Sequence, residues 1–515
     1  MKTLDTEVDK KEVEPIDEIQ EKEVYRYTKL LKSDKSPGPD GITNEALKLG
    51  LPTLLPYMTE LFNLIFKTGS IPKQWCTSDI ILLYKKGDPL GVTNYRPISL
   101  LPCLYKLFMT ILTKRITRPI EVSQPVEQAG FRSGFSTTDH IHTLELIIEK
   151  YQEYNRPLYI AFIDYSKAFD SISHKSIWKA LKTFHVNQGY INLLRTIYSK
   201  SVSRVRLEKR GEEINIGRGV RQGDPISPKL FIAVLENIFQ KINWKNCGLK
   251  IGDRYLSHLR FADDIAVLSE SPKQLEKMIC TLDKESSKVG LEMNSKKTKV
   301  MTNSHRKPIT VSGGELEYVN TYIYLGKQIS FNKNKNDEEI ERRVNITWKK
   351  YWSQKEVLKG NYCLNMKKII MDTTLLPCLL YGSQTWIYTN KAKLKIRSCQ
   401  RAMERSLLGL KKIHKIRSET IRNKTKVTDA LNHALKLKWN WAGHVSRLTD
   451  KRWTLLITKW KGPPGKRKVG RPIKRWADDI AQTVGKKLDG CGKRQKGVGK
   501  IGGGLYPSGI HIIIK

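Results

Sequence analysis

The chain has 515 residues, of which 39% are hydrophobic and 9% aromatic, and this supply of apolar side chains excludes general disorder. Its 92 Lys and Arg residues outnumber 51 Asp and Glu residues, giving a net charge of +41 that fits a polyanionic partner such as nucleic acid. No apolar run reaches the roughly 18–20 residues that cross a bilayer, so we expect no membrane association. The eight Cys residues are scattered without a CxxC pair, which predicts an intracellular protein with no structural zinc.

The first third of the chain is predicted to be mainly helical. Residues 1–24 carry nine acidic and four basic side chains and are expected to form a flexible acidic leader. Helical patterns follow at 24–32 and 53–68, with a turn-rich loop at 36–41 between them. A short apolar run predicts a strand at 80–84, and further helices are expected at 102–117 and 137–153.

Two apolar segments in the middle of the chain end in carboxylates. Residues 158–163 are all apolar and are followed by Asp164, which is typical of a buried strand that presents a carboxylate at its end. Residues 256–268 predict strand, turn and strand, with Asp263 and Asp264 at the turn. A Gly- and Pro-rich loop at 217–228 precedes a helix at 229–242, and 322–329 predicts another short strand pair.

These three aspartates predict a metal site. Neighbouring strands lie about 4.8 Å apart, so a strand end and a hairpin turn can bring Asp164, Asp263 and Asp264 together. Bare carboxylates in contact repel each other unless they bind cations, and Mg²⁺ prefers such oxygen ligands. Two ions of this kind serve phosphoryl transfer. A second Asp-Asp pair, Asp478 and Asp479, lies in a helical pattern and is expected to face water instead.

Seven ordered blocks carry a family resemblance. Residues 162–170, 219–228 and 261–264 are similar to the first catalytic motif, the nucleotide-pocket motif and the metal motif of non-LTR (LINE-type) retrotransposon reverse transcriptases. The remaining blocks, in the order of that family, are 36–41, 94–100, 290–294 with Lys297-Thr298, and 324–326. The block 470–472 with Trp476 and the second Asp-Asp pair resembles the C-terminal region of animal endonuclease–reverse transcriptase open reading frames.

The resemblance implies an α+β right-hand polymerase with fingers, a palm containing an antiparallel sheet, and a helical thumb, followed by a basic helical C-terminal region. It implies that Asp164 and Asp263 hold two Mg²⁺ ions with the main-chain carbonyl of Tyr165, that Asp264 lies alongside, and that Mn²⁺ can substitute. The other matched residues take these implied roles: Lys86 and Arg96 grip the triphosphate, Gln222 and Gly223 border the incoming nucleotide together with Tyr165, Phe169 faces the sugar 2′ position, Lys297 protonates the leaving pyrophosphate, and Tyr324, Leu325 and Gly326 grip the primer.

The implied function is RNA-directed DNA polymerisation in a retrotransposon, with an RNA template, a DNA primer or target, and dNTPs as partners. We expect no N-terminal endonuclease, and a nuclear site of synthesis with a cytoplasmic RNA-bound stage. Another reverse transcriptase lineage (intron maturase or telomerase-like) and a catalytically dead nucleic-acid-binding relic are the alternatives. The expected divisions are 1–24 leader, 25–330 fingers and palm, 331–430 thumb, 431–484 basic Trp-rich C-terminal region, and 485–515 low-complexity tail.

Overall fold

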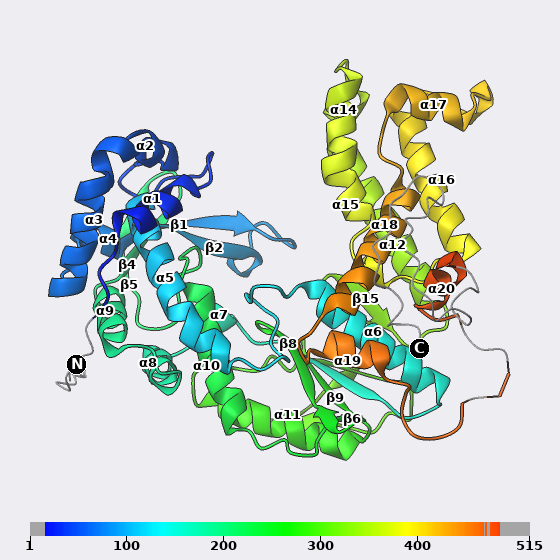
Figure 1. Cartoon of the computed structure of the whole chain (residues 1–515), viewed down its shortest axis with the longest axis horizontal. Helices are drawn as coiled ribbons and strands as arrows, with labels where there is room; N and C mark the ends of the chain where they lie inside the picture. Colours follow the sequence, from blue (N-terminus) through cyan, green and yellow to red (C-terminus); the bar gives the residue numbers. More distant parts are fainter. Residues whose placement is uncertain (1–15, 468, 471–473, 485–515) are drawn as a thin grey trace, which may run out of the picture. The chain divides into compact units, whose positions relative to one another are not determined.

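The computed structural model describes residues 16–467, 469–470 and 474–484, the side chains of 482–484 excepted. The chain forms two compact units (Figure 1). The first unit comprises Met1–Ser133, Asp164–Asn243 and Met278–Asn294, and the second comprises Gly134–Ile163, Trp244–Lys277 and Ser295–Lys515. Each unit is described by itself below. Within the described residues, no helix has the length and apolar character that a membrane span requires.

The first unit combines a four-stranded sheet with helices. The strand order is β2-β1-β4-β5, with β1 parallel to β4 and antiparallel to β2. Its strands are β1 (Thr77–Tyr84), β2 (Tyr95–Leu100), β4 (Val202–Arg206) and β5 (Arg210–Asn215). Its helices are α1 (Glu21–Lys29), α2 (Asn44–Leu49), α3 (Leu51–Thr68), α4 (Lys73–Cys76), η1 (Val92–Asn94), α5 (Cys103–Ser123), α7 (Ala168–Ser171), α8 (His174–Thr183), α9 (Gln188–Ser199) and α10 (Ser227–Lys241). Helix α11 (Pro272–Ser287) crosses the division between the two units.

Residues 16–24 of the expected acidic leader make packing contacts with the rest of the first unit. The Asn63 side chain accepts from the Ile19 N–H at 2.7 Å and donates to the Ile19 carbonyl at 3.0 Å. Ile19 and Val24 are buried, because α1 packs its apolar face against α3 and α5. Residues 1–15 lie outside the described residues.

The second unit is built on a five-stranded sheet in the order β13-β10-β3-β9-β8. Its strands are β3 (Tyr159–Ile163), β8 (His258–Phe261), β9 (Asp264–Ser269), β10 (Lys299–Thr302) and β13 (Glu317–Tyr318). Every residue of β3 is buried, as predicted from its unbroken apolar run, and α6 (Thr137–Glu153) packs against β8. Three small hairpins complete the unit: β6 (Leu249–Ile251) with β7 (Arg254–Leu256), β11 (Thr310–Val311) with β12 (Gly314–Glu315), and β14 (Thr321–Tyr324) with β15 (Lys327–Ser330).

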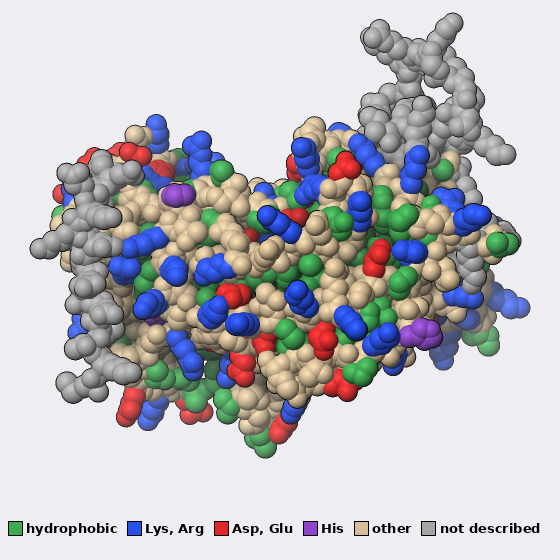
Figure 2. All heavy atoms as spheres, turned by 90° about the horizontal axis from the view of Figure 1, so that it is seen from below, with side chains coloured by type: hydrophobic (Ala, Val, Ile, Leu, Met, Phe, Trp, Pro, Cys, Tyr) green, Lys and Arg blue, Asp and Glu red, His purple; other side chains and the backbone are tan. Residues whose placement is uncertain are grey.

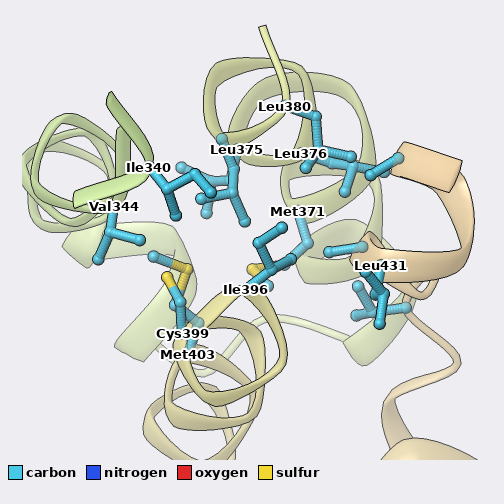
Figure 3. Packing of buried hydrophobic residues seen from close by; sticks show 14 of the residues in the cluster. Ile340, Val344, Met371, Leu375, Leu376, Leu380, Ile396, Cys399, Met403 and Leu431 are labelled. Atoms are coloured by element: carbon cyan, nitrogen blue, oxygen red, sulfur yellow. The ribbon is translucent and has the colours of Figure 1, made fainter. Parts of the chain in front are cut away.

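The C-terminal part of the second unit is a bundle of helices around one apolar core (Figure 3). The core joins Ile340 and Val344 to Ile396, and it continues to Leu431 and Ala434. The helices are α12 (Lys335–Ser353), α13 (Lys355–Lys359), α14 (Leu364–Ile370), η2 (Met371–Leu375), α15 (Leu376–Leu379), η3 (Ser383–Thr385), α16 (Asn390–Leu407), η4 (Lys412–His414), α17 (Ser418–Thr425), α18 (Ala430–Arg447), α19 (Trp453–Lys459) and α20 (Asp478–Val484).

This core extends across one of the expected divisions of the chain. The boundary between 331–430 and 431–484 falls at the start of α18, whose apolar face completes the same core as α12 and α16. The expected fingers-and-palm segment, 25–330, contributes residues to both compact units. The expected tail 485–515, and residues 471 and 472 of the basic block, lie outside the described residues.

Candidate active site

Strand pairing in the second unit brings together the two chain segments that carry the predicted carboxylates. β3 runs antiparallel to β9, with Ile163 opposite Ile265. Asp164 is the next residue after Ile163, and consecutive Cα atoms are about 3.8 Å apart. Asp263 and Asp264 immediately precede Ile265. The opposed pair Ile163 and Ile265 is therefore flanked by all three aspartates: Asp164 comes directly after Ile163, and Asp263 and Asp264 come directly before Ile265.

The β8–β9 hairpin has a tight two-residue turn. Phe261 pairs with Asp264, so Ala262 and Asp263 form the turn, one residue earlier than the Asp263-Asp264 turn that the sequence predicts. Ala262 is 4% exposed and has a φ of 57°, in the left-handed region that costs an L residue free energy. Asp264 is exposed and Asp263 half-buried. A backbone outlier of this kind next to two carboxylates indicates a functional turn.

The Asp164 side of the candidate site belongs to the first unit, where the 290–294 block anchors it. The Asn294 N–H donates to the Asp164 carbonyl at 2.8 Å, and the Ser166 N–H donates to the Glu292 carbonyl at 2.9 Å. Tyr165 lies between these two bonds, opposite Met293, so its own N–H and C=O are directed away from the 290–294 block. Its phenol is buried against Ser286, with 2.7 Å between the oxygens. Two of the predicted blocks thus form one piece of structure.

The donor set at these positions suits a hard divalent cation. Aspartate carboxylates and a main-chain carbonyl are the oxygen ligands that such ions prefer. Within the described part of the chain, however, no group of three or more His, Cys, Asp and Glu side chains is arranged to hold a metal ion. The metal-binding role of Asp164, Asp263 and Asp264 stays a prediction.

A buried ion pair fixes the 219–228 loop, and the sequence analysis missed it. Arg221 and Asp224 are each 3% exposed and lie 3.1 Å apart, and the Tyr105 hydroxyl donates to the same Asp224 oxygen at 2.7 Å. Burial disfavours the charge, but Tyr105 and Asp224 outweigh it, so the pKa of Arg221 is raised. An Arg and an Asp three residues apart in a Gly- and Pro-rich loop are the signal that could have revealed the pair.

Three predicted nucleotide-pocket residues lie together in the first unit. The Gln222 side chain donates to Asp170 at 2.9 Å, and the Gln222 carbonyl accepts from the Ser99 N–H at 2.7 Å. Gly223 has a φ of 113°, and a Cβ there would come within 2.7 Å of the Ser99 carbonyl oxygen. Phe169 is half-buried and stacks on Phe231 with ring centroids 4.5 Å apart. This packing holds the Phe169 ring in place, and its contact with a sugar stays a prediction.

Lys86 and Arg96 both occupy the β1–β2 region of the first unit. Arg96 lies on β2 opposite Leu83, and Lys86 follows β1. Both side chains are exposed. Exposed cations are available to an anionic ligand such as a triphosphate, which is the role that the family resemblance implies for them.

The predicted primer-gripping residues form the β14–β15 turn of the second unit. Leu325 and Gly326 have φ values of 47° and 79°, as a type I′ hairpin turn requires. Tyr324 is 2% exposed, so its ring packs in the core, 5.4 Å from Phe162. Burial, and then the charge of Asp264, raise the pKa of Tyr324. The Tyr324 ring is thus closed to a ligand, and the turn backbone is the part left to contact a primer.

The last predicted residue, Lys297, is exposed in the turn before β10, also in the second unit. Its role as a proton donor stays a prediction. The expectation that the second Asp-Asp pair faces water is wrong for Asp479, which is 9% exposed and lies 2.8 Å from Lys438. The partner is 41 residues away in the sequence, so no local pattern revealed it.

Comparison with known proteins gives a consistent picture. A family model described as reverse transcriptase (RNA-dependent DNA polymerase) matches residues 83–329. A transposon-derived protein of Caenorhabditis elegans is 35% identical over 246 residues, which cover 46% of this chain and 88% of that protein. The RNA-directed DNA polymerase from mobile element jockey of Drosophila funebris is 27% identical, over 77% of this chain and 44% of that protein.

Two further similarities were found, one to a retrotransposon protein and one to a solved structure. The Pol polyprotein of retrotransposable element R2 from Nasonia vitripennis is 29% identical, over 60% of this chain and 30% of that protein. The chain thus spans less than half the length of the jockey and R2 proteins. Among solved structures, apo telomerase from Candida tropicalis aligns at a TM-score of 0.39 and 12% identity, over 79% of this chain and 74% of that one.

Proposed function

Since the chain belongs to the reverse transcriptase family of retrotransposons, we propose that it is an RNA-directed DNA polymerase that extends a primer by adding nucleotides from dNTPs. Its nucleic-acid partners would be an RNA template and a DNA primer or target. The net charge of +41 supports polyanion binding, and Figure 2 shows Lys and Arg side chains scattered over the face in view.

The observation that carries this proposal is the register of β3 and β9. Two metal ions stabilise the attacking and leaving oxygens of a phosphoryl transfer. The carboxylates that hold these ions must therefore lie close together, even when they come from two segments of the chain. Ile163 is opposite Ile265, and the aspartates come directly after the first and directly before the second. A shift of one residue would send the two sets of side chains to opposite faces.

The proposed roles of the residues follow from their positions. Asp164, Asp263 and the Tyr165 carbonyl would hold the divalent ions, Mg²⁺ or Mn²⁺, with Asp264 alongside. Bound ions of this kind supply charge neutralisation and lower the pKa of the attacking hydroxyl. Lys86 and Arg96 would bind the triphosphate, and Gln222 and Gly223 would border the nucleotide. Much of the catalysis is then positioning and electrostatic stabilisation.

Two further residues would set selectivity and product release. The Phe169 ring, held by its stack on Phe231, would collide with a 2′-hydroxyl and so favour deoxynucleotides. The exposed Lys297 would protonate the leaving pyrophosphate. We place DNA synthesis in the nucleus, where target DNA is found, and an RNA-bound stage in the cytoplasm.

Primer extension on the purified chain tests this proposal. With poly(rA)/oligo(dT) and Mg²⁺ we expect incorporation of dTTP, much weaker incorporation of UTP, and none after chelation of the metal. A Phe169→Ala variant should reduce the difference between the incorporation of dTTP and the incorporation of UTP. A folded chain that binds the primer–template but incorporates nothing with either Mg²⁺ or Mn²⁺ would show a nucleic-acid-binding relic and contradict the proposal.

A further inference from the structure

Residues 381–388, here named the bridging segment, lie between two features that the proposed function leaves unconnected. One is the β14–β15 turn, whose backbone is the proposed primer contact. The other is the C-terminal segment, residues 474–480, which contains Trp476 and Asp479. All three belong to the second unit. Side-chain hydrogen bonds join the bridging segment to both.

On one side, the bridging segment holds the β14–β15 turn. The Tyr381 hydroxyl donates to the Leu325 carbonyl at 2.7 Å. The Gly326 carbonyl accepts from Arg342 at 2.8 Å and also from Arg343, whose guanidinium lies 4.6 Å from the Tyr381 ring centroid. Both turn carbonyls are therefore held by side chains outside the hairpin.

The residue after the turn, Lys327, adds a buried connection. It is 4% exposed, and its ammonium donates to the Thr385 hydroxyl at 2.7 Å and lies 2.9 Å from Glu145 on α6. A buried ammonium needs such partners, because an unpaired charge in the interior is costly. The position of Thr385 is therefore coupled to the position of the turn.

On the other side, the C-terminal segment holds the bridging segment. The Trp476 indole N–H donates to the Gln384 carbonyl at 2.7 Å. An Asp479 carboxylate oxygen accepts from the Tyr388 N–H at 3.2 Å. Lys438, 2% exposed, donates both to Asp479 at 2.8 Å and to the Trp386 carbonyl at 2.9 Å. Local turn bonds hold the N–H groups of Ser383, Thr385 and Trp386, whereas side chains from distant parts of the chain hold the Gln384 and Trp386 carbonyls and the Tyr388 N–H.

We propose that Trp476 and Asp479 are positioning residues for the primer, acting through the bridging segment on the β14–β15 turn. The bridging segment is an irregular stretch around the short helix η3, so no regular ladder of backbone bonds fixes it. Removing the support of Gln384 and Tyr388 leaves Thr385 and Tyr381 free to shift, and the turn shifts with them. A misplacement of about 1 Å is enough to cost roughly 10²-fold in rate. This inference rests on the proposed function, and on the primer-gripping role that the family resemblance implies for the turn.

The chain contains a matched pair of neighbouring carboxylates for the test. Asp479→Asn weakens the buried ion pair, whereas Asp478→Asn changes the half-buried neighbour, which accepts a hydrogen bond from the Arg475 N–H in its own segment. We expect Asp479→Asn to lower kcat/KM for the primer about tenfold or more, with the KM for dTTP unchanged. Asp478→Asn should behave as the parent chain, and Asp479→Glu should restore part of the loss.

Two more variants separate positioning from stability. Tyr381→Phe removes the hydroxyl that donates to the Leu325 carbonyl and also contacts the Thr137 hydroxyl, and it should reproduce the primer defect. The double variant Lys438→Met/Asp479→Leu removes both charges, which often preserves stability, but it also removes the bonds to Trp386 and Tyr388. We expect it to fold and still show the primer defect. Full activity in this folded double variant would overturn the proposal.

Hydrogen exchange provides a readout independent of activity. In Asp479→Asn the amides of residues 324–330 should exchange faster than in Asp478→Asn, while the amides of β3 keep their protection. If the parent chain has no polymerase activity, this comparison still decides the coupling, and only the proposed function fails. Equal exchange of the β14–β15 hairpin in the two variants would overturn the coupling itself, whatever the activity.

Discussion

Buried charged side chains are the residues whose replacement should matter most for stability. Arg221 and Asp224 are paired in the core of the first unit. Asp224→Ala leaves the Arg221 guanidinium without its counter-charge, and breaking a buried pair in this way costs about 3–5 kcal/mol. The urea midpoint of the first unit should fall accordingly. A midpoint within error of the parent chain would show that the pair has no structural importance.

Glu404 on α16 should make stability depend on pH. It is 1% exposed, and burial is the main reason that its pKa is raised to about 7. The negative charge of Asp429 also raises this pKa, whereas the positive charges of Arg422, Arg401 and Arg405 lower it. An unfolded Glu has a pKa near 4.3, so the folded state holds the proton more tightly. The contribution of Glu404 to the free energy of unfolding is therefore fully present below about pH 4.3. It is lost as the pH rises towards 7, and the loss amounts to about 3 kcal/mol.

The measurement is the urea midpoint of the full chain at pH 5 and pH 8. The parent chain should lose more stability over this interval than Glu404→Gln, whose side chain keeps the shape and cannot ionise. Identical pH dependence in the two proteins would mean that Glu404 titrates normally in the folded chain.

Single residues also mark how far the sequence could predict the site. The buried strand before Asp164 and the hairpin around Asp263 were predicted, because each leaves a local apolar pattern, although the turn lies one residue earlier than expected. Asp479 was not, because its burial depends on Lys438, which lies on another helix. Tyr324 was expected to grip a primer, but its ring is buried by Phe162, a contact between strands that are distant in the sequence.

At the scale of elements, the 219–228 loop depends on glycine at one position. A Cβ at Gly223 would lie 2.7 Å from the Ser99 carbonyl oxygen, and its φ is 113°, so Gly223→Ala forces the loop away from β2. We expect the KM for dTTP to rise about tenfold or more, with primer–template affinity unchanged. Gly217→Ala is the matched control, since a Cβ there meets nothing within 4 Å. Equal KM values for the two variants would contradict this account.

Elements with strong periodicity were predicted with accurate limits. The helix expected at 137–153 is α6, with the same bounds, and the hairpins around Asp263 and Gly326 are both present. The β4–β5 hairpin was missed. All residues of β5 are exposed, so the strand has no alternation of apolar and polar side chains and leaves no signal in the sequence.

At the scale of the whole molecule, the positive charge should make nucleic-acid binding sensitive to salt. Residues 401–426 hold nine basic and two acidic side chains and no Phe, Tyr or Trp, so this region is suited to phosphates rather than to base stacking. Replacing the exposed Lys411, Lys412 and Lys415 by Ala should reduce the slope of log K against log[salt] by up to about 2–3. The same count of replacements on α1, at Lys22, Arg26 and Lys29, is the control; equal slopes would contradict the expectation.

The central claim is that aspartates from two distant segments act at one catalytic point. The decisive measurement is the primer-extension rate of Asp164→Asn and Asp263→Asn beside Asp253→Asn, which changes an exposed carboxylate near the β6–β7 turn. We predict that either of the first two loses at least about 10²–10³-fold in rate while still binding primer–template, and that Asp253→Asn keeps the parent rate. Parent-like extension by Asp164→Asn or Asp263→Asn would contradict the account.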